Sequence, residues 1–199
     1  MIQSKNDLKY YLEADRISLG VSRKKPHLIS IYESDIIWKF QIALRKAEYY
    51  HNCKSKGIFK ILYKFFQYRL FRMQLKTGIT IPMNVFGPGL MITHLGPIIV
   101  NGFAKVGKNC CIHPFTCIGM NGRIPDTAII GDDVYISTGV KIIGKVKIAN
   151  GVMIGANAVV TKSVEEESIT VAGVPAKKIS NNGNDVPMEF RGADVAVFK

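Results

Sequence analysis

The side chains best suited to acid–base chemistry in this 199-residue chain are its four histidines. A neutral imidazole has an unperturbed pKa of about 6.5, so it can accept a proton from a substrate near neutral pH. His94 and His113 lie in a stretch rich in isoleucine, valine and glycine, whereas His27 and His51 lie where the spacing is helical. We therefore take His94 and His113 as the candidates for a general base.

Metal and disulfide chemistry are not indicated. None of the four cysteines forms a Cys-x-x-Cys pair, and none has a histidine at the spacing of a zinc ligand. The cysteines are Cys53, Cys110, Cys111 and Cys117. We expect reduced thiols and no metal.

The charge distribution indicates an anionic ligand or surface. The formal net charge is +12, and residues 54–125 contain no Asp or Glu. Such a stretch attracts anions. Because no helix-turn-helix, zinc finger or aromatic RNA-binding signature is present, we expect no nucleic acid. A phosphate-bearing small molecule or an anionic membrane face fits better.

Hydropathy gives no sign of a membrane span or a secretory leader. The chain has no run of about 18 uninterrupted apolar residues, and its first residues lack a basic segment leading into an apolar one. We therefore expect a folded cytoplasmic protein that does not span a membrane.

A six-residue period dominates the second half of the chain and must position the two histidines. An aliphatic β-branched residue recurs at every sixth position, and four residues after each the side chain is usually small or β-branched, Gly122 being the weakest member. The recurring residues are Val100, Val106, Ile112, Ile118, Ile124, Ile130, Ile136, Ile142, Ile148, Ile154 and Val160. A period of six fits neither a helix nor a simple half-buried strand, and it predicts a solenoid of short strands with these side chains inward. A β-sandwich is the alternative, but its turn signals would recur every 8–12 residues or so.

The residues before the repeat have helical spacing. Ser34 is a candidate N-cap for a first helix, and a second should follow Gly57. We predict a helical region over 1–76 that covers the open end of the solenoid, a solenoid domain over 77–180, and a loosely packed extension over 181–199. The basic, aromatic-rich stretch 54–76 fits either a core-facing helix with a solvated basic face or a helix on a membrane surface.

Four sequence blocks carry a resemblance to a known family. They are Gly-Leu-Met-Ile-Thr-His at 89–94, Ile-Gly-Asp-Asp-Val-Tyr-Ile at 130–136, Ile-Gly-Ala-Asn-Ala-Val-Val at 154–160, and Ala-Gly-Val-Pro-Ala-Lys at 172–177. The chain resembles the hexapeptide-repeat acyltransferases, and more narrowly the serine O-acetyltransferase-like branch that includes capsule and O-antigen acetyltransferases. The resemblance implies a left-handed parallel β-helix, a homotrimer with active sites between subunits, and direct acetyl transfer from acetyl-CoA to a hydroxyl.

The resemblance also assigns roles to residues. His94 matches the family's catalytic base, and Thr93 beside it is expected to contact the acceptor. His113 follows the repeat residue Ile112, so it should point away from the core, as either an acceptor-binding side chain or a surface residue. The backbone of Gly119 and Met120 matches the glycine-rich turn that would bind the oxyanion. Acetyl-CoA would lie on a groove of small residues, with lysines at its phosphates. The residues expected there are Gly155, Ala156, Ala172, Gly173, Pro175, Lys177 and Lys178.

The chain departs from the family where serine-specific members bind their acceptor. Ungapped alignment back from His94 places their acidic positions on Ile79 and Thr93, and a further family histidine falls near Thr127. The sequence therefore favours a sugar or polysaccharide-precursor hydroxyl as acceptor, with backbone orienting His94. Counting in sixes also allows His94 to be a buried structural residue.

Several alternatives remain at this stage. Serine O-acetylation and amino-sugar N-acetylation would use the same fold. A zinc enzyme like the gamma-class carbonic anhydrases would need three histidines, and the repeat has two. A non-catalytic scaffold would have no need of the Gly-Val-Pro-Ala-Lys ending.

Overall fold

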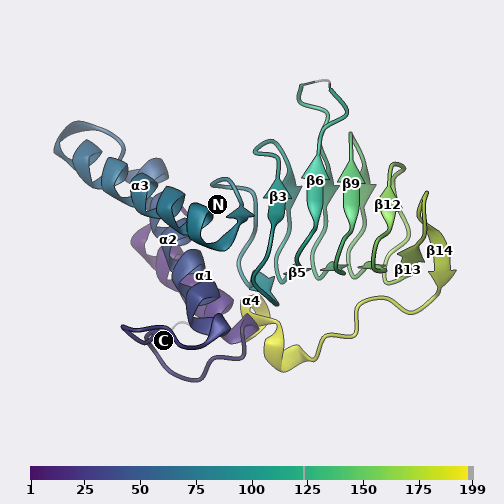
Figure 1. The fold of residues 1–199 in the computed structure, drawn as a ribbon, viewed down its shortest axis with the longest axis horizontal. Coiled ribbons are helices and arrows are strands. Elements are labelled where there is room, and N and C mark those ends of the chain that lie inside the picture. The colour runs from purple at the N-terminus through teal and green to yellow at the C-terminus, as the bar shows by residue number, and fades with distance from the viewer. Residues whose placement is uncertain (123, 197–199) are drawn as a thin grey trace.

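The computed structural model describes residues 1–122 and 124–196, and in it a helical region leads into a solenoid (Figure 1). The helices of the first region are α1 (Lys5–Ser18), α2 (Glu33–Cys53), the short 3-10 turn η1 (Gly57–Phe59) and α3 (Lys60–Thr77). The predicted helices are thus present. The helix for which we predicted Ser34 as the N-cap is α2. It begins at Glu33 and its N-cap residue is Tyr32, so the predicted N-cap is wrong. Among the described residues, no helix is both long and apolar enough to cross a membrane.

The solenoid consists of short strands that the chain visits in turn. Twelve of them are β1 (Ile79–Thr80), β2 (Met91–Ile92), β3 (Ile98–Val100), β4 (Lys105–Val106), β5 (Cys111–Ile112), β6 (Cys117–Gly119), β7 (Ile129–Ile130), β8 (Tyr135–Ile136), β9 (Lys141–Ile143), β10 (Lys147–Ile148), β11 (Met153–Ile154) and β12 (Val159–Val160). They are followed by β13 (Thr170–Ala172), β14 (Lys177–Ser180), the 3-10 turn η2 (Met188–Phe190) and α4 (Gly192–Val195).

Three sheets result, and the strands within each pair with strands from neighbouring coils. Their orders are β1-β3-β6-β9-β12, β10-β7-β4 and β14-β13-β11-β8-β5-β2. All pairs are parallel except β13 with β14, which closes the last coil. Successive strands alternate among the sheets, as a parallel β-helix requires, so the predicted solenoid is confirmed.

The repeating aliphatic residues form the core, with one exception. Ile112, Ile136 and Ile154 are almost fully buried and stack through directly paired strands. The small residues four positions later, such as Val134 and Val152, are buried as well. Ile124 is 74% exposed, so its predicted inward position is wrong. Val106 and Ile130 lie on neighbouring coils and pair directly. One sequence repeat between them, which contains Ile124, is therefore extra and forms a loop outside the coils.

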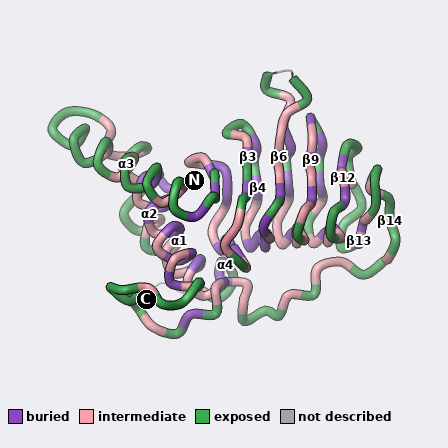
Figure 2. Tube along the Cα trace, viewed as in Figure 1, coloured by how far each residue is buried: buried purple, intermediate pink, exposed green. Residues whose placement is uncertain are grey.

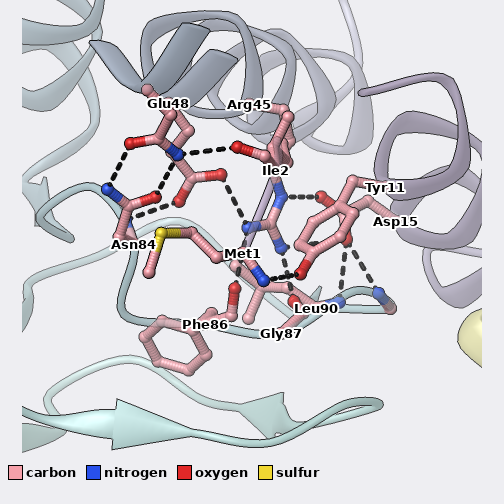
Figure 3. Close-up of polar contacts among 12 residues, drawn as sticks. Met1, Ile2, Tyr11, Asp15, Arg45, Glu48, Asn84, Phe86, Gly87 and Leu90 are labelled. Carbon is pink, nitrogen blue, oxygen red and sulfur yellow. Dashed lines mark hydrogen bonds and ion pairs between the residues drawn. The ribbon is translucent and has the colours of Figure 1, made fainter. Parts of the chain in front are cut away.

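Helix α2 covers the open end of the solenoid through a buried group of charged side chains (Figure 3). Arg45 is fully buried and donates to the carbonyl oxygens of Phe86 and Gly87, at 2.9 and 2.6 Å. It also pairs with Asp15 at 2.7 Å and with Glu48 at 3.1 Å.

The two carboxylates of this group bind backbone N–H groups of the same segment. Asp15 accepts from the backbone of Gly89 and Leu90, at 3.0 and 2.9 Å, and Glu48 accepts from that of Asn84 at 2.8 Å. The first coil has no preceding coil to satisfy its backbone, so charged side chains take that role. The sequence predicted helices at this end but not this cluster.

The C-terminal segment is not the loosely packed extension that we expected. It runs back along the solenoid, and α4 packs against α1 (Figure 1). Gly192 and Ala193 are buried: Gly192 donates its N–H to Ser18 Oγ at 3.0 Å, and Ala193 accepts from the Tyr10 hydroxyl at 2.6 Å. Lys108 on the solenoid forms an ion pair with Asp194 at 2.6 Å. Residues 197–199 of the predicted extension lie outside the described part.

Candidate active site

One edge of the solenoid gathers most of the predicted site residues. The strands β2, β5, β8, β11 and β13 pair side by side, with Ile92, Ile112, Ile136, Ile154 and Val171 in register. The residue after each of these five therefore lies at the same edge on successive coils. In order along the solenoid these residues are Thr93, His113, Ser137, Gly155 and Ala172. The predicted acceptor residues and the predicted coenzyme A groove thus share one edge.

His94 extends from this edge into solvent. Its side chain is 66% exposed, so the alternative of a buried structural histidine is wrong. Ile92 pairs with Ile112 and Val100 pairs with Ile118, which makes the corner between β2 and β3 longer than the corner of the next coil. Counting in sixes fails across this longer corner, and the extra length places His94 outside the core.

A carboxylate that the sequence did not predict lies beside His94. Glu33, the first residue of α2, has its Oε2 3.4 Å from His94 Nδ1, and its Oε1 accepts from the backbone N–H of Leu95. We predicted that a backbone group orients the imidazole of His94. In the structure a side chain from the helical region lies beside it instead. An acidic residue in the first turn of a helix was the available signal, but nothing in the sequence connects that helix to His94.

The loop that leads to Glu33 is held by another carboxylate. Asp35 is buried and accepts from Arg23, and it lies 2.7 Å from His27 Nδ1. Although burial raises the pKa of Asp35, these hydrogen bonds with His27 and Arg23 lower it to about 2. His27 thus helps to fix the start of α2, although its side chain is 51% exposed.

His113 lies next to His94 and contributes an unpaired polar atom. The two ring centroids are 6.4 Å apart, and the ring of Tyr135 lies 5.0 Å away on the other side. Burial, and to a lesser degree the charge of His94, lower the pKa of His113, which favours a neutral ring. Within the described residues, His113 Nε2 and Thr93 Oγ1 are buried and have no hydrogen-bond partner. Buried polar atoms normally have partners, so these two atoms are exceptions within the described residues.

The residues predicted for the coenzyme A groove lie close together where the strands of neighbouring coils pair. A Cβ on Gly155 would lie 2.8 Å from the Cβ of Ala172, so no larger residue fits without movement. Gly173 adopts a positive φ of 95°, and the peptide bond before Pro175 is cis. This turn leads directly into β14, which begins with Lys177.

The two lysines differ in their surroundings. Lys178 forms an ion pair with Glu166 at 2.5 Å, whereas Lys177 is exposed and has no ion pair among residues 1–122 and 124–196. Both line a surface cavity of about 230 Å³. Lys177 is therefore the better candidate for a phosphate contact.

Gly119 and Met120 lie elsewhere on the solenoid. Gly119 ends β6, which belongs to the sheet of β3 and β9, whereas His94 follows β2 in another sheet. The structure therefore does not place the predicted oxyanion residues on the edge that carries His94. Within the described part of the chain, no three His, Cys, Asp or Glu side chains gather as metal ligands would.

Comparison with known proteins supports this architecture. Residues 127–162 match the family described as "Bacterial transferase hexapeptide (six repeats)". The serine acetyltransferase of Staphylococcus aureus (strain Mu50) is 37% identical over 120 residues, which is 57% of this chain and 54% of the relative. The chain thus spans about half the length of the curated relatives it matches.

Solved structures agree in fold over most of the chain. Serine acetyltransferase from Brucella abortus in complex with coenzyme A has a TM-score of 0.68 at 24% identity, covering 90% of this chain and 70% of its own. The Neisseria gonorrhoeae serine acetyltransferase in complex with serine has a TM-score of 0.64 at 28% identity, covering 89% and 71%. These relatives give no support to the expected capsule and O-antigen branch. The solenoid is a left-handed parallel β-helix, and its residues 127–162 match the hexapeptide-repeat family model.

Proposed function

We propose that this protein transfers an acetyl group from acetyl-CoA to a hydroxyl group, with His94 as general base. The observation that carries the proposal is the shared edge of the solenoid. At one end of this edge an exposed histidine lies beside a carboxylate, and at the other end lie the small residues of the proposed groove. Relatives with this fold have been solved with coenzyme A, which supports the same donor here.

The contacts of His94 define its role. If Nδ1–H donates to Glu33, the other ring nitrogen, Nε2, is left unprotonated and can accept the hydroxyl proton. The acceptor oxygen then attacks the thioester carbonyl, and the tetrahedral intermediate collapses with release of the coenzyme A thiolate. The imidazolium returns its proton to that thiolate, so no acyl-enzyme forms and His94 ends neutral.

For the acceptor we propose L-serine, in place of the sugar hydroxyl that the sequence favoured. The argument for a sugar was the absence of acidic residues at Ile79 and Thr93. Ile79 is fully buried and does not face the site, whereas Glu33 supplies a carboxylate from another element. A carboxylate at the site suits an ammonium group, and the named relatives are serine acetyltransferases.

A thiol-release assay tests this choice of acceptor. With saturating acetyl-CoA, L-serine should give a higher kcat/KM than nucleotide sugars, oligosaccharides and amino sugars. Serine methyl ester, which keeps the ammonium group but lacks the carboxylate charge, is the matched control for recognition of the amine. Rapid acetylation of a sugar together with negligible acetylation of serine would contradict the proposed acceptor.

Replacing Glu33 tests its role beside His94. Glu33→Gln keeps the size and an oxygen for the Leu95 N–H but removes the negative charge. Both side chains are well exposed, so we expect a loss on the order of fivefold to tenfold in kcat/KM. Glu33→Asp should recover part of the rate. Normal turnover of Glu33→Gln would exclude this role.

Assembly is also part of the proposal. We propose a homotrimer in which Gly119 and Met120 of one subunit approach His94 of the next, because one chain leaves them on different sheets. Light scattering at micromolar concentration should report three chains per particle. A stable, fully active monomer would contradict this arrangement.

A further inference from the structure

Helix α3 is apolar on two opposite sides. On one side Phe66, Leu70 and Met73 pack against the core, and Phe66 stacks on Tyr50 of α2 at 4.4 Å between ring centroids. The other side and the turn before it carry a stripe of large apolar residues at helical spacing, each more than half exposed. Much of α3 is accordingly coloured as exposed in Figure 2. We call this set the α3 outer face: Ile58, Ile61, Phe65, Tyr68, Phe71 and Leu75.

Exposed cations flank the α3 outer face. The helix contains no acidic residue, and among the described residues none of its cations forms an ion pair with a carboxylate. The cations are Lys60, Lys64, Arg69, Arg72 and Lys76. Two of them contact side chains of the stripe: the Arg69 guanidinium is 5.9 Å from the centroid of Phe65, and Arg72 donates to the Tyr68 hydroxyl at 3.3 Å.

The beginning of the helix adds to the positive field. No side chain caps it, its first turn has no acidic residue, and Lys56 and Lys60 are exposed there. The whole surface therefore combines apolar contact area with uncompensated positive charge.

The combination of apolar contact area and positive charge favours one kind of binding partner for the α3 outer face. A second copy of α3 would bring apolar residues but would also place cations against cations, because the helix has no carboxylates. The surface of an anionic bilayer supplies both complements, since acyl chains meet the stripe and phosphates meet the lysines and arginines. The cations exclude a spanning helix, so the helix would lie parallel to the membrane.

We propose that the α3 outer face binds a membrane surface rich in anionic phospholipids. The test is vesicle flotation with the full chain. The protein should float with vesicles of phosphatidylcholine mixed with phosphatidylglycerol and stay in solution with phosphatidylcholine alone. Added salt should weaken the binding, because the phosphate contacts are screened.

Two pairs of variants separate the apolar and the charged contributions. Phe65→Ser should weaken binding about tenfold or more, while Ile179→Ser, which removes an exposed apolar residue next to lysines on β14, should have no effect. The double variant Lys64→Gln and Arg72→Gln should lose about fivefold per cation. Its control, Lys145→Gln with Lys147→Gln, removes two exposed lysines from the solenoid.

Several outcomes would overturn the proposal. Absence of flotation with anionic vesicles would do so, as would equal losses in the α3 variants and their controls. The third such outcome is that Phe65→Ser dissociates an oligomer and the parent chain does not bind vesicles. This result would assign the α3 outer face to a contact between copies of the chain. Melting temperatures of all variants confirm that the losses arise in folded protein.

Discussion

His94→Ala should lower the rate of acetyl transfer by on the order of 10²–10⁴ and leave the fold intact. Removing a positioned general base has an effect of this size. Because the side chain is 66% exposed and outside the core, its loss removes little packing. The melting temperature should therefore stay close to that of the parent chain. Acetyl-CoA affinity should also persist, since the proposed groove lies on later coils.

Measuring turnover, acetyl-CoA affinity and melting temperature on one preparation distinguishes a base from a structural residue. His113→Ala is the matched control, because its ring lies 6.4 Å from that of His94 on the neighbouring coil. It should weaken acceptor binding while a measurable kcat remains. If His113→Ala loses turnover and His94→Ala keeps it, the base is His113 and the assignment of His94 is wrong.

Arg45→Met should be the most destabilising of the substitutions considered, at about 3–5 kcal/mol of unfolding free energy. Methionine fills much of the arginine volume, so the loss is not one of packing. The substitution leaves Asp15 and Glu48 buried without their cation, and it leaves the carbonyl oxygens of Phe86 and Gly87 without a donor. Urea unfolding at one fixed protein concentration measures the difference.

The control for Arg45 is its neighbour Lys46. Lys46→Ala removes a cation from the same helix. Within the part of the chain that the structure describes, its ammonium group makes only a ring contact, with Nζ 5.8 Å from the centroid of Phe66. We expect a loss of less than about 1 kcal/mol. Similar small losses for both variants would show that the buried charges do not hold the helices to the solenoid.

The destabilisation by Arg45→Met should depend on pH. Burial raises the pKa of Asp15 and Glu48, and Arg45 opposes that rise. Without Arg45 both folded-state pKa values rise further above the unfolded values of about 4, so the folded state binds more protons than the unfolded state. Stability of the variant then falls as pH rises through this range. The difference from the parent chain should be larger at neutral pH than near pH 4.5.

The fold was predictable from the sequence because its cause is local and repeated. Every coil needs an inward aliphatic side chain at the same position. The spacing of Ile112, Ile136 and Ile154 therefore indicates the solenoid without knowledge of contacts between distant residues. The shared edge follows from the same regularity, since the residues after successive strands must align. Thr93, His113 and Gly155 therefore align along one edge of the solenoid, and the roles assigned to them stay predictions.

What the sequence could not supply depends on breaks in that regularity and on contacts across the chain. The long corner at His94 and the looped-out repeat at Ile124 shift the count of six, and only the paired strands reveal by how much. Glu33 reaches His94 from a helix far away in the sequence. Tertiary packing decided these contacts because side chains meet through the orientation of whole elements, which no local pattern specifies.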